Sequence, residues 1–160
     1  MKRTISEKGL ELIKQWEGFS NTVYKDVAGL PTIGVGHLLT QYELSSGKID
    51  IYGNSIKYRY GLTNEQVLDL LHWDINDFVD DINDLVMVEL NQNQFDALVS
   101  FAFNVGTKAF YQSTLLKKLN QHLYDEVPGQ LMRWVYSGGR KINGLVNRRN
   151  NEIKLWNGEI

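Results

Sequence analysis

Residues 16–37 read WEGFSNTVYKDVAGLPTIGVGH, and this stretch decides which fold the sequence adopts. It starts where a helical pattern ends, because apolar residues recur at helical spacing up to Trp16 and Gly18 then interrupts the pattern. Beyond Gly18 the β-forming residues alternate on both sides of the turn at 29–31. We therefore expect a helix, opened by a capping box at Thr4 and Glu7, and then a small antiparallel hairpin or three-stranded sheet.

The rest of the chain carries mainly helical signals. Thr63 and Gln66 form a second capping box before a long apolar stripe, which consists of Val67, Leu68, Leu71, Ile75, Phe78, Ile82 and Leu85. A buried helix is expected between Asn91, as its N-cap, and Gly106. The remaining pattern predicts helices at about 113–124, 128–136 and 145–156, whereas residues 40–60 fit either a second strand pair or a loose loop.

These signals predict one α+β domain over residues 1–160. Its small antiparallel β lobe is expected at 19–61, and a larger helical lobe at 1–18 and 62–160, with a cleft between the lobes. A chain of this length, 42% hydrophobic and without cysteine, can bury a core that needs no disulfide. The formal net charge is −2, but the charges are unevenly distributed along the chain, because residues 62–107 hold nine acids and no base. Residues 108–160 are basic, which fits solvated helix faces or attraction to a polyanion such as a cell wall.

Several classes of function are excluded by what the sequence lacks. No apolar run approaches the roughly 18 residues of a membrane helix, and the charged first segment is not a signal peptide. The sequence 34–36 has no third glycine of a dinucleotide fingerprint, and the three histidines are scattered rather than spaced as zinc ligands. Basic residues interleaved with aromatics, which mark nucleic-acid binding, are also missing. We therefore expect no metal, no cofactor, no nucleic acid and no stable membrane insertion.

Two acids and a threonine in the deciding stretch fit glycoside hydrolysis. This reaction needs a protonated carboxyl group that protonates the leaving oxygen, and an ionised group on the opposite side of the sugar. Glu17 ends a helix, where the negative end of the helix dipole opposes ionisation. Asp26 lies in a hydrated turn between strands, and Thr32 on the return strand can hydrogen-bond a water held by Asp26. An isolated pair of acids is ordinary surface charge in most proteins, so these residues need the surrounding pattern to support them.

That pattern resembles the phage-type lysozymes, which are endolysins with muramidase activity. The family is marked by a glutamate, an aspartate nine residues later and a threonine six beyond it, and this sequence has Glu17, Asp26 and Thr32 at that spacing. The segments LIKQWEGF, VYKDVAGLPTIGVGHLLT, NQNQFDALVSFAFNVG, STLLKKLN and GLVNRRNNEIKLW also look like the family. The resemblance covers nearly the whole chain and fails only at residues 40–60.

The resemblance implies a lysozyme-like fold and a role for each of these residues. Glu17 would be the general acid, and Asp26 and Thr32 would hold the attacking water, although a covalent intermediate on Asp26 stays open. The bond cleaved would be the β-1,4 bond between N-acetylmuramic acid and N-acetylglucosamine. His37 would form a structural ion pair with Asp74, which the helical pattern leaves at the border of its apolar stripe.

Three further positions are substrate-binding candidates by resemblance. Phe103 and Asn104 would line the sugar cleft, or else pack in the core and cap a helix end. Arg133 would lie near the peptide stems of the substrate, or else be a solvated arginine. Arg148 and Arg149 could hold the last helix to the protein body or touch the wall polymer.

The expected partner is the glycan strand of peptidoglycan, and the expected protein is a monomer. With no export signal it would stay in the host cytoplasm and depend on a holin-type membrane protein to reach the periplasmic wall at the end of a phage cycle. Two rivals are less favoured. A lytic transglycosylase uses one glutamate and makes an anhydro-sugar, and Asp26 and Thr32 at the family spacing argue against it. An inactive wall-binding or assembly protein on the same scaffold would have lost Glu17 or Asp26, and both are present.

Overall fold

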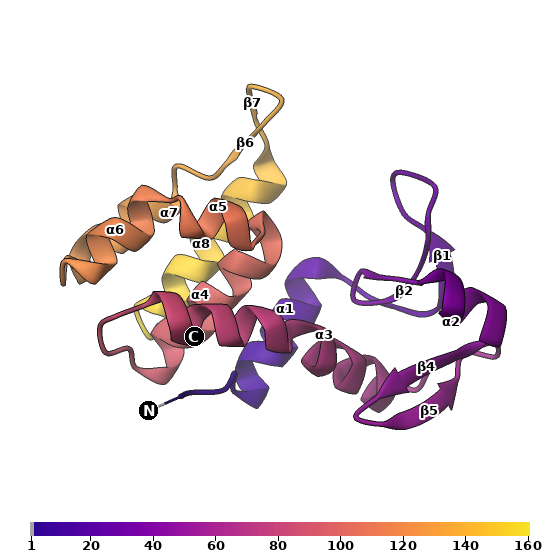
Figure 1. Ribbon diagram of the computed structural model, residues 1–160. Helices are drawn as coiled ribbons and strands as arrows, with labels where there is room; N and C mark the ends of the chain where they lie inside the picture. Colours follow the sequence, from indigo (N-terminus) through magenta and orange to yellow (C-terminus); the bar gives the residue numbers. More distant parts are fainter. Residues whose placement is uncertain (1) are drawn as a thin grey trace. The chain divides into compact units, whose positions relative to one another are not determined.

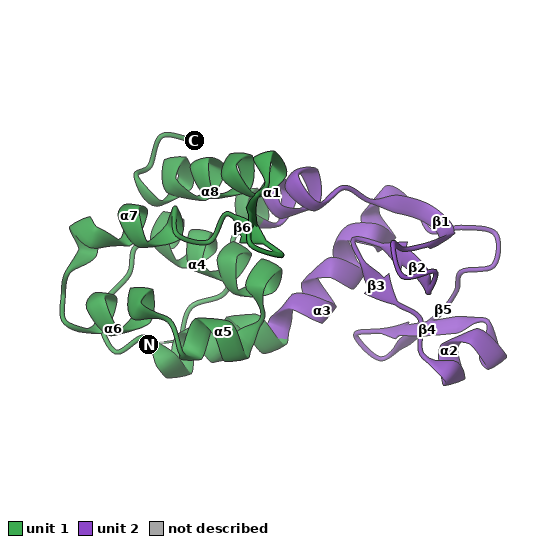
Figure 2. Cartoon of the chain, turned by 90° about the horizontal axis from the view of Figure 1, so that it is seen from above, with its two compact units in different colours: residues 1–9, 77–160 green, residues 10–76 purple. Residues whose placement is uncertain are grey.

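The computed structural model describes residues 2–160, which form two compact units (Figure 2). One unit spans Leu10–Asn76, and the other consists of the residues up to Gly9 and of Asp77–Ile160. The stretch 19–61, where the sequence predicts the β lobe, lies inside the unit Leu10–Asn76. The fold is α+β, with small antiparallel sheets among helices (Figure 1).

The unit Leu10–Asn76 contains both larger sheets. Its elements, in chain order, are most of α1 (Glu7–Glu17), β1 (Ser20–Lys25), β2 (Pro31–Gly34), β3 (His37–Leu38), α2 (Gln41–Ser46), β4 (Lys48–Ile51), β5 (Asn54–Lys57) and the first part of α3 (Asn64–Leu85). The strands β1, β2 and β3 form one antiparallel sheet in that order, and β4 pairs with β5. The second strand pair settles the open choice for residues 40–60, and α2 is a helix that the sequence analysis missed.

Glycines make the turn between β2 and β3 possible. Ile33 pairs with His37, and only two residues, Val35 and Gly36, connect the two strands. Gly34 and Gly36 adopt φ values of 67° and 68°, which side chains with a Cβ rarely tolerate. The tight turn brings His37 beside the buried side of β2, where Thr32, Ile33 and Gly34 are shielded from solvent.

The β4–β5 hairpin turns at Tyr52 and Gly53, which both have positive φ. Two such residues are typical of the type I′ turn that joins two-residue hairpins. The Tyr52 ring packs edge-on against Trp73 and His72 of α3, at centroid distances of 5.2 and 5.7 Å. These contacts offset the conformational cost of the left-handed backbone of Tyr52, which glycine or asparagine would adopt more easily.

The N-terminus of α1 differs from its prediction, because Ser6 rather than Thr4 caps the helix. The Gly9 N–H donates to Ser6 Oγ over 3.0 Å, and Ser6 in turn donates both its N–H and its hydroxyl to the buried carboxylate of Asp96. Asp96 is distant in sequence, so a local capping pattern gives no sign of this partner. The predicted capping box at Thr4 and Glu7 was therefore wrong.

The second predicted capping box is confirmed. The Gln66 N–H donates to Thr63 Oγ1 over 3.0 Å, and the Thr63 N–H donates to Gln66 Oε1 over 2.9 Å, at the start of α3. The apolar stripe faces inward as predicted, although Leu68, Phe78 and Leu85 are only half-buried; the buried members are Val67, Leu71, Ile75 and Ile82.

The other unit is mainly helical. After the end of α3 it contains α4 (Gln92–Val105), α5 (Thr107–Tyr111), α6 (Thr114–Asn120), the 3₁₀ helix η1 (Tyr124–Glu126), α7 (Val127–Leu131), the strand pair β6 (Tyr136–Ser137) and β7 (Arg140–Lys141), and α8 (Asn143–Trp156). Asn91 caps α4 and Gly106 follows it, as the sequence predicts. The helices expected at 113–124 and 128–136 are shorter than predicted, and α5 and the β6–β7 pair were missed.

The core of this unit is built around α4. Every residue from Phe95 to Ala102 is buried, and α4 packs against α8. The contact includes a buried polar cluster in which Arg148 and Arg149 both bind the carboxylate of Glu152, with Arg148 Nε and Arg149 Nη1 at 3.2 and 2.6 Å from it. The Glu152 carboxylate also accepts a hydrogen bond from the Ser100 hydroxyl over 2.6 Å. Both arginines therefore hold α8 to the protein body.

Within residues 2–160, no helix is both long and apolar enough to cross a bilayer. The same residues contain no group of three or more His, Cys, Asp or Glu side chains that could hold a metal ion.

We predict that Thr63→Ala lowers the free energy of unfolding by about 1 kcal/mol, because the Gln66 N–H loses its capping acceptor. Urea denaturation followed by circular dichroism measures this loss. Thr63→Ser keeps the hydroxyl and should stay near the parent, so an equal loss in both variants would contradict the capping role.

Candidate active site

The unit Leu10–Asn76 holds five of the eight residues singled out from the sequence, namely Glu17, Asp26, Thr32, His37 and Asp74. Glu17 is the last residue of α1 and is exposed. Gly18 follows with φ 75°, and its N–H donates to the Lys14 carbonyl over 2.9 Å. This left-handed glycine ends the helix and turns the chain toward β1.

Asp26 shapes the turn between β1 and β2. One carboxylate oxygen, Oδ1, accepts hydrogen bonds from the N–H groups of Ala28 and Leu30, each over 2.9 Å. The Asp26 carbonyl also accepts from the Gly29 N–H over 2.9 Å. The second carboxylate oxygen, Oδ2, accepts no hydrogen bond from residues 2–160, and Asp26 is half-buried. The side chain is therefore held through one oxygen and presents the other.

The main chain of Leu30 connects Asp26 to Thr32. The Leu30 carbonyl accepts from the Asp26 N–H over 3.0 Å and from the Thr32 hydroxyl over 2.9 Å, while the Leu30 N–H binds the Asp26 carboxylate. Thr32 is only 1% exposed. Because its hydroxyl proton is used by Leu30, Thr32 Oγ1 can meet a further group only as an acceptor. A single peptide segment thus fixes both side chains.

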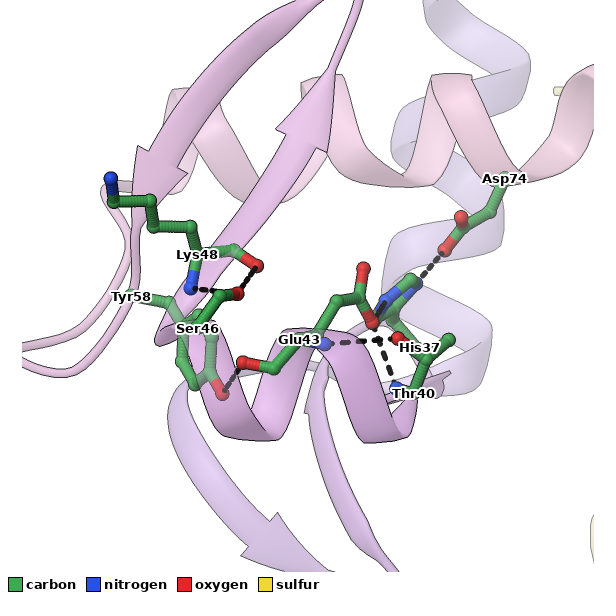
Figure 3. A network of polar contacts seen from close by, with 7 residues as sticks. All are labelled: His37, Thr40, Glu43, Ser46, Lys48, Tyr58 and Asp74. Carbon is green, nitrogen blue, oxygen red and sulfur yellow. Dashed lines mark hydrogen bonds and ion pairs between the residues drawn. The ribbon is translucent and has the colours of Figure 1, made fainter.

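His37 lies between two carboxylates, as Figure 3 shows. Its Nδ1 is 2.8 Å from Asp74 Oδ2 on α3, and its Nε2 is 2.9 Å from Glu43 Oε1 on α2. Glu43 Oε1 also accepts the Thr40 N–H over 2.9 Å and so completes the capping box of α2. One imidazole ring therefore joins β3 to two helices.

These contacts change the pKa of His37. Burial alone lowers this pKa, but the hydrogen bond and negative charge of Asp74, followed by those of Glu43, outweigh burial and raise it from 6.5 to about 9. His37 is therefore an imidazolium at neutral pH, and both ring nitrogens donate.

The other unit holds Phe103, Asn104 and Arg133. Phe103 is half-buried and packs edge-on against Phe78, with ring centroids 5.4 Å apart. Asn104 is exposed near the end of α4, and its Oδ1 accepts a hydrogen bond from Arg149 Nη2. That bond orients the amide so that its NH₂ group is the part available to a ligand.

Arg133 is exposed and lies beside a cavity of about 470 Å³. The other residues that line this cavity are Ala109, Gln112, Ser113, Thr114, Gln130 and Trp134. The nearest polar contact of the guanidinium is long, at 3.5 Å from Arg133 Nη1 to Gln130 Oε1. Arg133 is thus presented to solvent beside polar side chains rather than fixed in an ion pair.

The spacing of Glu17, Asp26 and Thr32, the turn that connects the last two and the α+β fold agree with a comparison to known proteins. The sequence profile described as phage lysozyme matches residues 14–152, which is most of the chain. The chain belongs to the phage lysozyme family. The match includes every residue named above as a site candidate.

Individual members of the phage lysozyme family are similar over nearly the whole chain. An endolysin of Bacillus phage PZA is 41% identical over 96% of the chain, and an endolysin of Salmonella phage P22 is 39% identical over 95% of it. The chain covers 55% of the former and 97% of the latter, so it spans about half the length of the Bacillus phage relative. The crystal structure of a P22 lysozyme variant superposes with a TM-score of 0.81 at 38% identity, covering 96% of this chain and 98% of that one.

Two contributors to the site, Glu43 and Leu30, were missed in the sequence, and for Arg149, which was named there, the contact with Asn104 was missed. Glu43 had a readable signal, because Thr40 and Glu43 have the spacing of a capping box, but neither residue reveals that the same carboxylate meets His37. Leu30 acts through its main chain, which no side-chain pattern marks. Arg149 orients Asn104 across 45 residues of sequence, and such a long-range contact leaves no local pattern.

We predict that the contribution of His37 to stability depends on pH. Because the folded-state pKa of His37 is raised from 6.5 to about 9, its stabilising effect is fully present below pH 6.5 and is lost as the pH rises through about 9. His37→Ala should therefore lower the free energy of unfolding by about 1–3 kcal/mol near pH 6 and by much less above pH 9. Denaturant titrations at the two pH values measure this; an equal loss at both would show that the imidazolium charge does not matter.

Glu43 and Asp74 should each raise the pKa of His37. We predict that Glu43→Gln and Asp74→Asn both lower this pKa, and that Asp74→Asn lowers it more, because Asp74 is the larger contributor. An NMR titration of the His37 ring gives the pKa directly, and the ring of the exposed His122 is the internal control. An unchanged titration in Asp74→Asn would contradict the ion pair.

Proposed function

We propose that this protein is a lysozyme that hydrolyses the glycan strands of bacterial peptidoglycan and causes lysis of the host. The proposal rests on its membership of the phage lysozyme family together with the link that Leu30 makes between Asp26 and Thr32. The bond cleaved is the β-1,4 bond between N-acetylmuramic acid and N-acetylglucosamine, which makes the enzyme an N-acetylmuramidase.

In this proposal Glu17 protonates the leaving glycosidic oxygen, and a water molecule attacks the anomeric carbon. The water donates one proton toward Asp26 Oδ2, the oxygen that accepts no bond from residues 2–160. It donates the other to Thr32 Oγ1, which is available only as an acceptor. With both protons engaged, a lone pair of the water oxygen faces the sugar. Asp26 takes the proton as the new C–O bond forms, so atoms and charges balance.

The candidates of the other unit complete the proposal. The Asn104 amide, oriented by Arg149, donates to a sugar substituent, and Phe103 offers an apolar edge beside it. Arg133 binds a carboxylate of a peptide stem beside its 470 Å³ cavity. Arg133→Gln should then raise KM for whole sacculi more than for glycan chains stripped of peptide.

We also propose that the protein acts as a monomer and reaches the wall from the host cytoplasm through a membrane opened by a holin-type protein. The endolysin names of its relatives support a role in phage release. Cells that express the protein should stay intact until the membrane is permeabilised and should then clear rapidly. Clearing without permeabilisation would contradict the dependence on a holin, and sedimentation measures the oligomeric state.

We predict that Glu17→Gln abolishes clearing of permeabilised Gram-negative cells, because the amide has no proton to give the leaving oxygen. Asp26→Asn should reduce the rate on the order of 10²-fold or more, the range of a lost general base. Turbidity assays measure both rates, and circular dichroism must show parent-like folding. Full activity in Glu17→Gln would refute the assignment.

The products of the digest separate this proposal from its two rivals. Mass spectrometry should find reducing-end sugars that have gained water, whereas anhydro-sugars would identify a lytic transglycosylase. If the folded parent protein gave no product at all, the inactive wall-binding protein would be the remaining interpretation. NMR of the first-formed anomer distinguishes a held water, which inverts the anomer, from a covalent intermediate on Asp26, which retains it.

A further inference from the structure

A small basic cavity lies in the unit Leu10–Asn76, between the end of α2 and the β4–β5 hairpin. Its volume is about 220 Å³, and its lining residues are Ser46, Gly47, Lys48, Lys57, Arg59 and Tyr60. This volume is below the roughly 300–1,000 Å³ of typical pockets for drug-sized molecules. The cavity suits one small group rather than a run of sugar rings.

Two of the three cations face each other at an energetic cost. Lys48 and Lys57 are direct partners in the antiparallel register of β4 and β5, and both are exposed. Like charges at directly opposed positions destabilise a strand pair. The fold requires no lysine at either position, since an uncharged polar residue would satisfy the same exposed sites.

The guanidinium of Arg59 lines the same cavity as the two lysines and lies next to Gly47. This glycine ends α2 in the left-handed conformation, with φ 73°, and a Cβ at that position would lie 3.4 Å from Arg59 Nη2. That distance is an ordinary van der Waals contact, so the guanidinium lies beside the main chain of residue 47 at the cavity. The side chain of Tyr60, which is 99% exposed, borders the same space.

None of the acids among residues 2–160 forms an ion pair with this basic cluster, which consists of Lys48, Lys57 and Arg59. Glu43, the only acid of α2, is turned toward His37, and Figure 3 shows the Lys48 side chain extending away from it. Asp50 follows Lys48 on the same exposed face of β4 and is paired across the hairpin with Ser55.

We propose that Lys48, Lys57 and Arg59 form a binding site for a phosphate group, separate from the residues assigned to hydrolysis. A guanidinium can donate to two oxygens at once, and each ammonium can donate to one more. Together they match the three terminal oxygens and the charge of up to −2 of a phosphate better than the two oxygens of a carboxylate. Tyr60 supplies a ring and a hydroxyl for whatever carries the phosphate.

The charge of the whole unit favours a phosphate carried by a soluble or wall-linked molecule over a phospholipid surface. Residues 10–76 contain eight acids and five bases, so the unit is negative overall. A flat anionic membrane interacts with charges up to about 8–10 Å away, the screening length in physiological salt, so the excess of acids in this unit opposes its approach. A single phosphate inside the cavity is governed mainly by the three cations around it.

The test uses the full chain and tripolyphosphate as the probe, with calorimetry at physiological ionic strength. The parent should bind, and the triple variant Lys48→Gln, Lys57→Gln, Arg59→Gln should bind at least about tenfold more weakly, because charge-assisted hydrogen bonds are lost. The matched control removes the same charge from exposed sites in the other unit, as Lys117→Gln, Arg140→Gln, Lys141→Gln, and should bind within about twofold of the parent. Amide NMR shifts should centre on Gly47 and Tyr60.

Four outcomes would overturn the proposal. The triple variant binding as tightly as the parent would remove the site, and an equal loss in the control would show an unspecific charge effect. A glutamate peptide of equal charge binding as well as tripolyphosphate would assign a carboxylate instead. Vesicles of anionic phospholipid that bind the parent as tightly as the probe would assign a membrane surface. None of these measurements uses glycan hydrolysis, so they are independent of the proposed enzymatic activity.

Discussion

The position of His37 between Asp74 and Glu43 is the constraint on which the unit Leu10–Asn76 depends. Without it, β3, α2 and α3 would lose the hydrogen bonds that join them, and α2 has no buried residue that could replace these bonds. The imidazolium donates to one carboxylate on each side, and the Glu43 carboxylate at the same time caps the helix it belongs to. The sheet and the two helices are thereby held in one arrangement, and the same sheet carries the turn between β1 and β2.

The turn between β1 and β2 leaves acceptor oxygens of Asp26 and Thr32 available without a rigid side-chain cage. One carboxylate oxygen of Asp26 accepts hydrogen bonds from main-chain N–H groups, and the Thr32 hydroxyl donates its only proton to a main-chain carbonyl. The other carboxylate oxygen of Asp26, in the turn, and the acceptor capacity of the Thr32 hydroxyl, on β2, remain available. Because the bonds that position these groups are main-chain bonds, most substitutions at Val27 or Ala28 leave them intact.

Much of this arrangement could be predicted from the sequence, and the failures have a common cause. The capping box of α3, the bounds of α4 and the glycine turns depend on neighbouring residues, so local patterns were sufficient for them. The N-cap at Ser6 was missed because its partner, Asp96, lies 90 residues away. Similarly, the helical pattern indicated that Asp74 is half-buried and needs a partner. It did not indicate Glu43, the second carboxylate that contacts His37, because α2 is too short to show a periodic pattern. For the candidate site, spacing and resemblance gave the residue types, but not the main-chain link through Leu30.

The left-handed Tyr52 shows a conflict between local and long-range preferences at the tip of the β4–β5 hairpin. An asparagine or glycine there would relax the backbone, yet it would remove the ring that packs on Trp73 and His72. The backbone of the hairpin turn would then be less strained, but the hairpin would lose its aromatic contacts with α3. A protein engineered for greater stability at this position would gain little net free energy, and the hairpin would move more freely than before. Tyr52 therefore adopts an unfavourable backbone conformation, and its ring contacts in return fix the orientation of the whole strand pair.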